Sequence, residues 1–599
     1  MSRRAAVLLP YAVFLILAAV SWNRWIEPFV DTGRELMVPW RVSRGEALYR
    51  DVRFYYGPLA PWLGAAVDSV AGRRFAARIA LAALVAILHL EALRRLARRL
   101  TTETLASLAA SLAVAVAFFL RPGGCHLFPY SLDTSLAVAA ATGAVLLATS
   151  GGSSRRDRAA AACLLAALLA RPEIGLAGLG AITLERVLAS DAAAKRRLGW
   201  LVALPVLAAA IVYALASAGT PAATLAKEGW LAVLFVPTEF RNVYASFAGV
   251  DRPALRLAEL GLVLFALLAV GIWLLLAAIA AARLRRRSEA GARAPQVAAV
   301  AILAVAALVA LRPPAAVRET VDLLPPLVRA VPPLLFAAAI AGAALRLRDR
   351  SRNSFVAGVP DSVLLLALLF AARLLLAAGY VGPYDGFYLP LPIVVAVAML
   401  FRAAARVPAQ IDVSPRPTAF PGLVAASLAV FLAARIGALA LAYRDPAWSR
   451  VATPAGSLFV IEPLAGATRD ALANLSRRVP PNGSIVGFPE AGFFNWVLGR
   501  TNPLAQDQFF PGHLDRAGEQ EAITRLSRMP PDAVVLVNVR TAGHGRAAFG
   551  KDYLEELDGY VRSRFRPAAE FGPGAGSSPR IGDPGFFIQI LVPAGRPAP

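Results

Sequence analysis

The sequence predicts a mainly α-helical protein, a polytopic transmembrane helix bundle followed by a C-terminal α/β domain. Of its 599 residues, 58% are hydrophobic and only 17% are charged, with a mean hydropathy of +0.58. Ordinary soluble domains carry about 25% charged residues. Apolar runs long enough to span a membrane recur up to residue 443, and short apolar runs then alternate with helical patterns. We therefore expect a transmembrane domain over residues 1–443 and a soluble domain over residues 444–599.

Because a bilayer core about 30 Å thick needs roughly 20 apolar residues per helix, we expect about thirteen transmembrane helices. The predicted spans are residues 5–22, 75–96, 104–120, 133–150, 158–171, 173–189, 198–218, 256–282, 296–311, 330–346, 360–380, 388–405 and 420–442. The first has the charge and length of a signal peptide, but no small-residue cleavage site precedes Asn23, so we expect an uncleaved helix. The Arg171-Pro172-Glu173 break between two short spans is alternatively a kink in one helix.

Basic residues accumulate in every second loop, and this pattern sets the expected orientation. The basic clusters are residues 94–99, 155–158, 195–197, 283–287 and 346–352. With the N-terminus in the cytoplasm, all of these face the cytoplasm, and the C-terminal domain lies on the periplasmic side. We expect a multi-pass protein of a bacterial inner membrane, in contact with the lipid bilayer. The net charge of +23 falls in short clusters between apolar spans, which argues against a nucleic acid partner.

The first outer loop, residues 23–74, departs from this pattern because it carries many arginines on the outer side. Its densest stretch is Asp31–Pro61, DTGRELMVPWRVSRGEALYRDVRFYYGPLAP, in which arginines alternate with carboxylates and aromatic residues. One interpretation is a salt-bridged cap on the bundle, and the other is an anion-handling surface beside carboxylates. Residues 58–72 and 221–248 are too weakly apolar to span, and we expect them to lie in the membrane interface.

The C-terminal domain is expected to contain a small, mostly parallel sheet, because strand and helix patterns alternate. The predicted strands are residues 457–462, 484–488, 533–538 and 586–592, and the predicted helices are residues 466–478, 518–528 and 550–564. No nucleotide-binding, hydrolase or metalloprotease motif occurs in it.

Carboxylates of the outer loops are the candidate catalytic groups, since a carboxylate at a membrane surface can act as a general base. Asp31 is placed best, nine residues after residue 22, with Glu35 beside it and Asp133 at the start of the fourth span. For any single acid the alternative is a solvated loop charge. The four histidines lack metal-ligand spacing, so we expect no metal; a divalent ion held by acids alone is not supported by their spacing.

Two arginines, Arg373 and Arg435, fall inside predicted spans, each seven residues from residue 380 or 442. At about 1.5 Å per residue, they would lie roughly 10 Å below the outer surface. A guanidinium at that depth can bind a lipid phosphate bidentately, and the alternatives are a salt bridge or snorkelling.

This layout resembles the GT-C superfamily of integral membrane glycosyltransferases, which includes protein O-mannosyltransferases, lipid A aminoarabinose transferases and the RgtA/B/C/D-like lipopolysaccharide-core transferases. The strings DTGRE (31–35), RGEALYRD (44–51) and YGPLAP (56–61) look like the first loop of uncharacterised bacterial members. The stretch GFPEAGFFNWVLGRTNP (487–503) also resembles segments in them.

The resemblance implies a polyprenyl-phosphate sugar donor, an envelope acceptor (glycolipid, polysaccharide or protein), and inversion at the anomeric carbon with a first-loop carboxylate as base. That role falls to Asp31, and the second acid of such enzymes corresponds to Asp133. Many relatives place two adjacent acids in the first loop, whereas Thr32 follows Asp31 here and Glu35 is the nearest substitute. Arg373, Arg435 and Lys227 would neutralise the departing phosphate.

Two alternative functions remain from the sequence: a lipid-linked-sugar transporter or flippase, and a non-catalytic envelope-assembly protein. A transporter should show repeated halves and polar, broken helices at the membrane midplane. The sequence contains no internal repeat of that kind.

Overall fold

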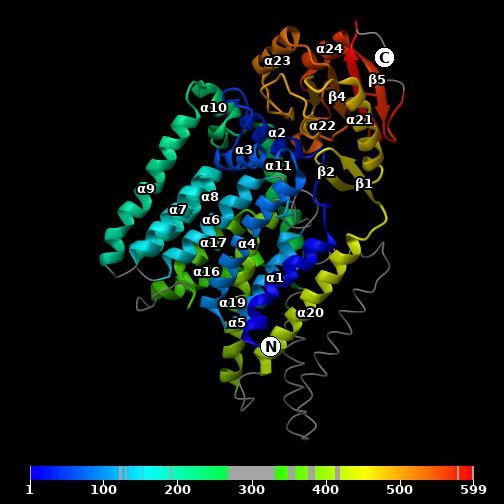
Figure 1. Cartoon of the computed structure of the whole chain (residues 1–599). Helices are drawn as coiled ribbons and strands as arrows, with labels where there is room; N and C mark the ends of the chain where they lie inside the picture. Colours follow the sequence, from blue (N-terminus) through cyan, green and yellow to red (C-terminus); the bar gives the residue numbers. More distant parts are fainter. Residues whose placement is uncertain are drawn as a thin grey trace.

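The computed structural model describes residues 2–119, 125–128, 131–150, 153–188, 192–262, 264, 265, 268, 331–348, 356, 358–375, 385–411, 419–576 and 579–595 (Figure 1). The predicted span 296–311 and the predicted basic loop 283–287 lie outside these residues. So does most of the predicted span 256–282 after residue 262.

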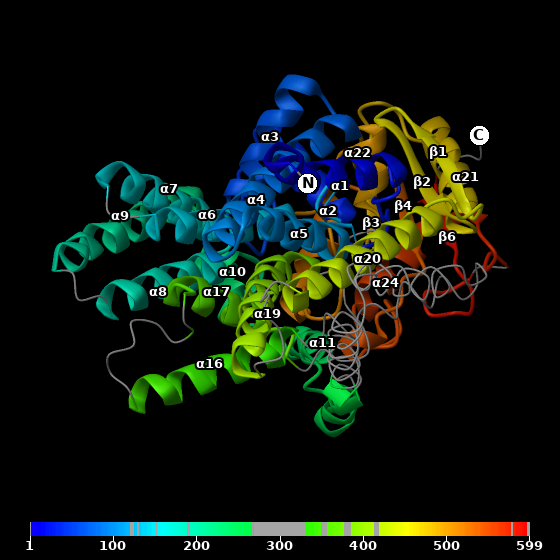
Figure 2. The same cartoon turned by 90° about the horizontal axis from the view of Figure 1, so that it is seen from below.

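Long helices build the part of the chain that precedes the C-terminal strands (Figure 1). They are α1 Arg3–Val20, α4 Phe75–Leu100, α5 Glu103–Ala113 with the π-helical turn η1 Val114–Phe118, α6 Leu132–Ala148, α7 Ser154–Ala170, α8 Pro172–Leu188, α9 Ala192–Ala216, α16 Val331–Arg348, α17 Asp361–Ala372, α19 Pro390–Ile411 and α20 Ala419–Ala442. Within the described residues, five are long and apolar enough to cross a membrane: α1, α4, α9, α16 and α20. Seen from below, α7 and α9 lie on one side of the bundle, away from α20 (Figure 2).

The Arg171-Pro172-Glu173 break is a chain reversal. Helix α7 ends at Ala170, and Pro172 opens α8, where its missing N–H costs no helical hydrogen bond. A Cβ built on Gly175 would lie 2.6 Å from the Leu168 amide nitrogen, and one on Gly178 would lie 3.4 Å from Leu164 Cδ2. Later residues of α8 thus contact earlier residues of α7, which is the pattern of an antiparallel helical hairpin. The alternative of one kinked helix is therefore wrong.

Helix α17 is shorter than the predicted span 360–380. It ends at Ala372, and Arg373 occupies its C-cap position. The expectation that Arg373 lies inside a helix, seven residues before its end, is therefore wrong. A cation at this position is favoured by the partial negative charge of the helix C-terminus.

Short helices gather at the end of the bundle that carries the C-terminal region (Figure 1). Those labelled there are α2 Thr32–Ser43, α3 Leu59–Ala71, α10 Ala222–Glu228 and α11 Thr238–Ala248. Two further short helices are η2 Trp230–Val233 and α18 Asp385–Tyr388. Helix α3 covers the segment predicted to lie in the membrane interface. Its Trp62 and Val70 side chains are exposed, and the location of this helix in the membrane interface stays a prediction.

The C-terminal region contains a two-stranded antiparallel sheet of β1 Trp448–Thr453 and β2 Gly456–Ile461, and a four-stranded sheet in the order β3-β4-β6-β5. The four strands are β3 Ile485–Phe488, β4 Ala533–Val537, β5 Phe565–Phe571 and β6 Ile588–Pro593. The helices are α21 Leu464–Arg478, α22 Gly492–Leu498, α23 Arg516–Arg528, η4 Ala542–His544 and α24 Glu555–Arg564.

The prediction of a mostly parallel sheet is wrong. Only β3 and β4 are parallel, while β6 is antiparallel to both β4 and β5. Strand β5, which the sequence analysis missed, has no helix between it and β6. A direct return without a crossover helix produces an antiparallel pair. The predicted strand 457–462 is also real, but it pairs with β1 outside the main sheet.

Candidate active site

Two stretches far apart in the sequence, residues 31–61 and 487–508, meet where the bundle joins the C-terminal region. Helix α2 approaches α22 closely at Gly33 and Gly492. A Cβ built on Gly33 would lie 3.0 Å from the Phe493 amide nitrogen and 3.1 Å from Gly492 Cα. Two backbones come this close only where a residue has no side chain. The contact sets the residues before α22 against the start of α2, where Asp31 lies.

Asp31 precedes α2 in a left-handed backbone conformation, with φ of 59°. An aspartate at this position commonly caps its helix, yet in the described part of the chain its carboxylate makes no capping bond. Instead, Oδ1 accepts a hydrogen bond from Gln508 Nε2 at 2.9 Å and lies 3.2 Å from Arg34 Nη1. The Asp31 N–H donates to Glu490 Oε2 at 2.9 Å. The side chain is 21% exposed, so it is held in place and still accessible.

Arg34 connects Asp31 to Glu35. Its Nη2 lies 3.1 Å from Glu35 Oε1, and Glu35 Oε2 accepts the Leu132 N–H at 3.3 Å at the start of α6. Burial raises the pKa of Glu35 to about 8, against the opposing effect of the Arg34 charge.

Asp133, in the first turn of α6, is fully buried in an ion pair with Arg171. The distance from Asp133 Oδ2 to Arg171 Nε is 2.7 Å, and Asp133 Oδ1 accepts the Ser131 hydroxyl at 2.7 Å. Arg171 also reaches Glu173, at 3.2 Å from its Nη1 to Oε1. The structure thus brings Asp133 close to Glu35 but surrounds it with partners.

A cavity of about 380 Å³ opens beside this cluster. Four cationic side chains line it: Arg34, Arg171, Lys227 and Arg373. Aromatic side chains form much of the remaining wall: Tyr55, Tyr56, Phe240, Tyr244 and His513. The Arg171 guanidinium lies 3.9 Å from the Tyr56 ring centroid, and that of Arg34 lies 5.3 Å from it. Cations among aromatic rings suit a ligand that joins an anionic group to a ring-shaped or apolar one.

His513 joins three separate parts of the chain in the wall of this cavity. Its ring is stacked between Tyr55 of the first loop and Phe240 of α11, with centroid distances of 4.9 Å to each. Burial lowers the pKa of His513 to about 3, so it is a neutral aromatic group at physiological pH. The C-terminal region therefore supplies part of the cavity wall.

Two of the three predicted phosphate-binding residues line the cavity. The Arg373 guanidinium lies 4.9 Å from the Tyr388 ring centroid. Lys227 is exposed and forms an ion pair with Asp515.

Arg435 lies elsewhere, against the π-helical turn η1. Its Nε donates to the Ala115 carbonyl at 3.1 Å, and it is not among the residues that line the cavity. A π-helical turn shifts the backbone hydrogen-bond pattern of its carbonyls, and the Arg435 contact falls at that turn. The phosphate-binding role of Arg435 stays a prediction.

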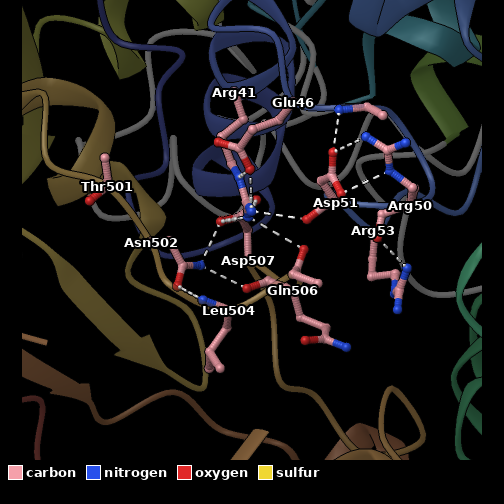
Figure 3. A network of polar contacts seen from close by, with 12 residues as sticks. Arg41, Glu46, Arg50, Asp51, Arg53, Thr501, Asn502, Leu504, Gln506 and Asp507 are labelled. Atoms are coloured by element: carbon pink, nitrogen blue, oxygen red, sulfur yellow. Dashed lines mark hydrogen bonds and ion pairs between the residues drawn. The ribbon is translucent and has the colours of Figure 1, made fainter. Parts of the chain in front are cut away.

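A second polar network fastens the first loop to the C-terminal region (Figure 3). Arg41 lies 3.4 Å from Asp507 Oδ2 and 2.7 Å from Glu46 Oε2. Asn502 donates to Asp507 Oδ1 at 2.8 Å. Burial raises the pKa of Asp507, while the Arg41 charge opposes this effect.

The salt-bridged interpretation of the first loop fits its arginines: Arg41, Arg50 and Arg53 form ion pairs with carboxylates. Arg34 is also ion-paired, with Asp31 and Glu35, and in addition lines the cavity. The anion-handling interpretation stays a prediction.

Sequence reasoning missed several residues that surround Asp31 and the cavity. The stretch 487–503 contains Glu490, but nothing in the string distinguishes that acid from a loop charge. Gln508 and His513 lie beyond it and carry no motif. From the sequence, Arg171 was considered only as part of the break between two predicted spans. An arginine at the end of a span could have been recognised as a candidate site residue, because a buried cation needs an anionic partner.

Among the described residues, no group of three or more histidine, cysteine, aspartate or glutamate side chains has the geometry of a metal site. The absence of a metal requirement stays a prediction.

No protein-family profile and no curated protein matches the sequence. Solved structures are similar at low identity. The oligosaccharyltransferase AglB from Archaeoglobus fulgidus, in complex with an inhibitory peptide and a dolichol-phosphate, is 13% identical with a TM-score of 0.47, over 97% of this chain and 74% of its own. ArnT from Cupriavidus metallidurans, bound to undecaprenyl phosphate, is 15% identical with a TM-score of 0.41, over 98% and 97%.

The arabinofuranosyltransferase AftD from Mycobacteria is 14% identical with a TM-score of 0.40, over 100% of this chain and 40% of its own. At these identities and TM-scores the likeness assigns no function to this chain and no role to any of its residues.

Proposed function

We propose that this protein is an inverting glycosyltransferase that moves a sugar from a polyprenyl-phosphate donor to an acceptor of the bacterial envelope, on the periplasmic side of the inner membrane. The observation that carries the proposal is the 380 Å³ cavity, which four cations, five aromatic rings and Glu173 line, and whose Arg34 forms an ion pair with Asp31. The acceptor is a glycolipid, polysaccharide or protein that presents a hydroxyl or amine.

The cationic side of the cavity holds the donor phosphate. Arg34, Arg171 and Arg373 supply planar guanidinium groups, which match phosphate oxygens bidentately. Tyr56 and the aromatic wall provide flat surfaces for the sugar ring or the first isoprene units. Lys227, at the exposed margin, adds a positive charge that attracts the lipid headgroup.

Asp31 is the general base. Its carboxylate removes the proton from the acceptor hydroxyl or amine as the acceptor atom bonds to the anomeric carbon. On the opposite face, the bond from that carbon to the phosphate oxygen breaks, and its electron pair leaves with the polyprenyl phosphate. The arginines stabilise the charge that develops on this leaving group. One displacement of this kind inverts the anomeric configuration.

The test is a transfer and hydrolysis assay on purified protein in detergent with radiolabelled undecaprenyl-phosphate-linked glucose, mannose, galactose and arabinose. We expect the wild type to release or transfer the label from at least one donor. Asp31→Asn should lower that rate by about 10²-fold or more, the usual contribution of a general base. The matched control is Asp51→Asn, because Asp51 is a first-loop acid whose ion pair with Arg50 is exposed.

Retained turnover in Asp31→Asn would refute its role as base. No turnover of any donor, together with thermal stabilisation by undecaprenyl phosphate, would replace the transferase with the flippase or the non-catalytic lipid-binding protein.

A further inference from the structure

Glu490 is a buried carboxyl group that the reaction described above does not use. It lies in the C-terminal region, just before α22, and its exposed fraction is 0%. Its Oε2 accepts the Asp31 N–H at 2.9 Å, across 459 residues of sequence. Among the described residues, Oε1 has no hydrogen-bond partner. A carboxyl oxygen buried without a partner costs free energy, so its retention calls for an explanation.

The backbone and carboxylate of Asp31 are not held in place by α2 alone. Its left-handed φ of 59° is unfavourable for a residue with a Cβ, by about 1 kcal/mol. Its carboxylate forgoes the helix cap that would ordinarily fix it. The contacts that fix it from outside α2 come from Glu490 on the backbone N–H and from Gln508 on Oδ1.

We propose that Glu490 is a positioning residue for Asp31, which it holds by accepting the Asp31 backbone N–H, with Gln508 orienting the Asp31 carboxylate. This inference rests on the proposed function, because it assigns the C-terminal region a part in that reaction. A neutral acceptor avoids the repulsion that a second negative charge would exert on the Asp31 carboxylate. Burial, followed by the nearby Asp31 charge, raises the pKa of Glu490 to about 8, which agrees with a protonated group at neutral pH.

Gln508 completes the arrangement from the other side. Its amide nitrogen donates to Asp31 Oδ1 at 2.9 Å, and its amide oxygen accepts from Arg34 Nη1 at 3.2 Å. One amide thus fixes both partners of the Asp31–Arg34 ion pair. The Gln508 amide and the Arg34 guanidinium both engage Asp31 Oδ1, at 2.9 Å and 3.2 Å. In the proposed reaction, Oδ2 takes the acceptor proton.

The test compares Glu490→Ala, Glu490→Gln and Gln508→Ala with the wild type, on the donor that the wild type turns over. Glu490→Ala removes the acceptor for the Asp31 N–H, and we expect kcat to fall by about 10²-fold, the cost of misplacing a catalytic group by about 1 Å. The KM for the donor should stay within about twofold, because no cavity-lining residue changes. Glu490→Gln keeps a neutral acceptor of the same shape and should recover most of the lost kcat.

Folding is monitored by thermal stabilisation with undecaprenyl phosphate, and kcat is expressed per folded molecule. If Glu490→Ala does not fold, Gln508→Ala tests the positioning of Asp31 instead. We expect its kcat to fall by about 10-fold at constant KM. Wild-type kcat in the folded alanine variants would overturn the inference. Failure of Glu490→Gln to recover any activity would also overturn it, because an acidic proton or a charge would then be required.

The role of Asp31 as base and the positioning role of Glu490 can be refuted independently. If Asp31→Asn abolishes turnover and Glu490→Ala does not, only the positioning role of Glu490 is wrong. If Asp31→Asn retains turnover, the proposed base is wrong whatever the Glu490 variants do.

Discussion

The buried carboxyl groups around the cavity are of two kinds. Asp133 and Asp507 each lie against an arginine, at 2.7 Å and 3.4 Å, and form ion pairs. Glu35 and Glu490 receive backbone N–H donors, and their pKa values are raised to about 8 by burial. Glu35 also forms an ion pair with Arg34 at 3.1 Å, so burial raises the pKa of this carboxyl group even beside a cation. Asp31 belongs to neither kind, because it is paired with Arg34 and partly exposed.

We expect Asp133→Asn to lower the free energy of unfolding by about 3 kcal/mol, the cost of leaving a buried charge, here that of Arg171, without its partner. Thermal and denaturant unfolding in detergent would measure this loss. The matched control is Glu173→Gln, which affects the same arginine from a side chain that is 41% exposed; its effect should be under about 1 kcal/mol. A variant with wild-type stability and no transfer would instead make Asp133 a second acid of the reaction.

Helices α2 and α22 are the elements that bring Asp31 and Glu490 together. Each is short, with 12 and 7 residues, and neither would be stable alone. Their stability comes from packing on each other and on the bundle, through side chains such as Met37 and Phe493 that are fully buried. The approach at Gly33 and Gly492 sets their separation, and with it the distance from Glu490 to Asp31.

We expect Gly33→Ala to destabilise the protein by about 1–3 kcal/mol, because the new methyl group meets backbone atoms of α22 that cannot rotate away. Transfer activity should fall as well, since α22 must move off α2. Gly559→Ala is the control: its Cβ meets no atom within 4 Å in α24, and alanine is the better helix former. Equal stability of both alanine variants would show that α2 and α22 can separate without cost.

In the whole molecule, hydrogen bonds and a buried ion pair join the helix bundle to the C-terminal region, in addition to the chain connection between them. Backbone hydrogen bonds cross between the two parts: Arg53 N–H to the Ala505 carbonyl and Phe75 N–H to the Ala455 carbonyl, each at 3.0 Å. The buried Arg41–Asp507 pair adds to them (Figure 3). A domain attached through so many buried contacts does not move independently, unlike one held by a small polar interface.

We expect Asp507→Asn to weaken this attachment by about 3 kcal/mol, because the Arg41 charge loses a buried partner. Limited proteolysis should then release a C-terminal fragment faster, through cleavage between α20 and β1. Asp515→Asn is the control, since the Asp515–Lys227 pair is exposed and should matter by less than about 1 kcal/mol. A fragment released at the same rate from both variants would show that the Arg41–Asp507 pair does not hold the C-terminal region in place.

The sequence by itself determined the features that depend on local composition. The length and apolar content of each span are properties of consecutive residues, so the bounds of α1, α4 and α20 follow the predicted spans within a few residues. The strands β3, β4 and β6 are short apolar runs for the same reason. The first loop also stands out in the sequence, because a segment of that charge density beside a span cannot enter lipid.

Only the tertiary structure decided which of these residues act together. Arg373 and Arg435 carry the same signature, an arginine in an apolar run, yet one lines the cavity and the other contacts a π-helical carbonyl. Glu490 reads as an ordinary loop acid until folding brings it to Asp31. The physical reason is that burial and pairing, which set the charge and position of a side chain, arise from contacts between residues hundreds of positions apart.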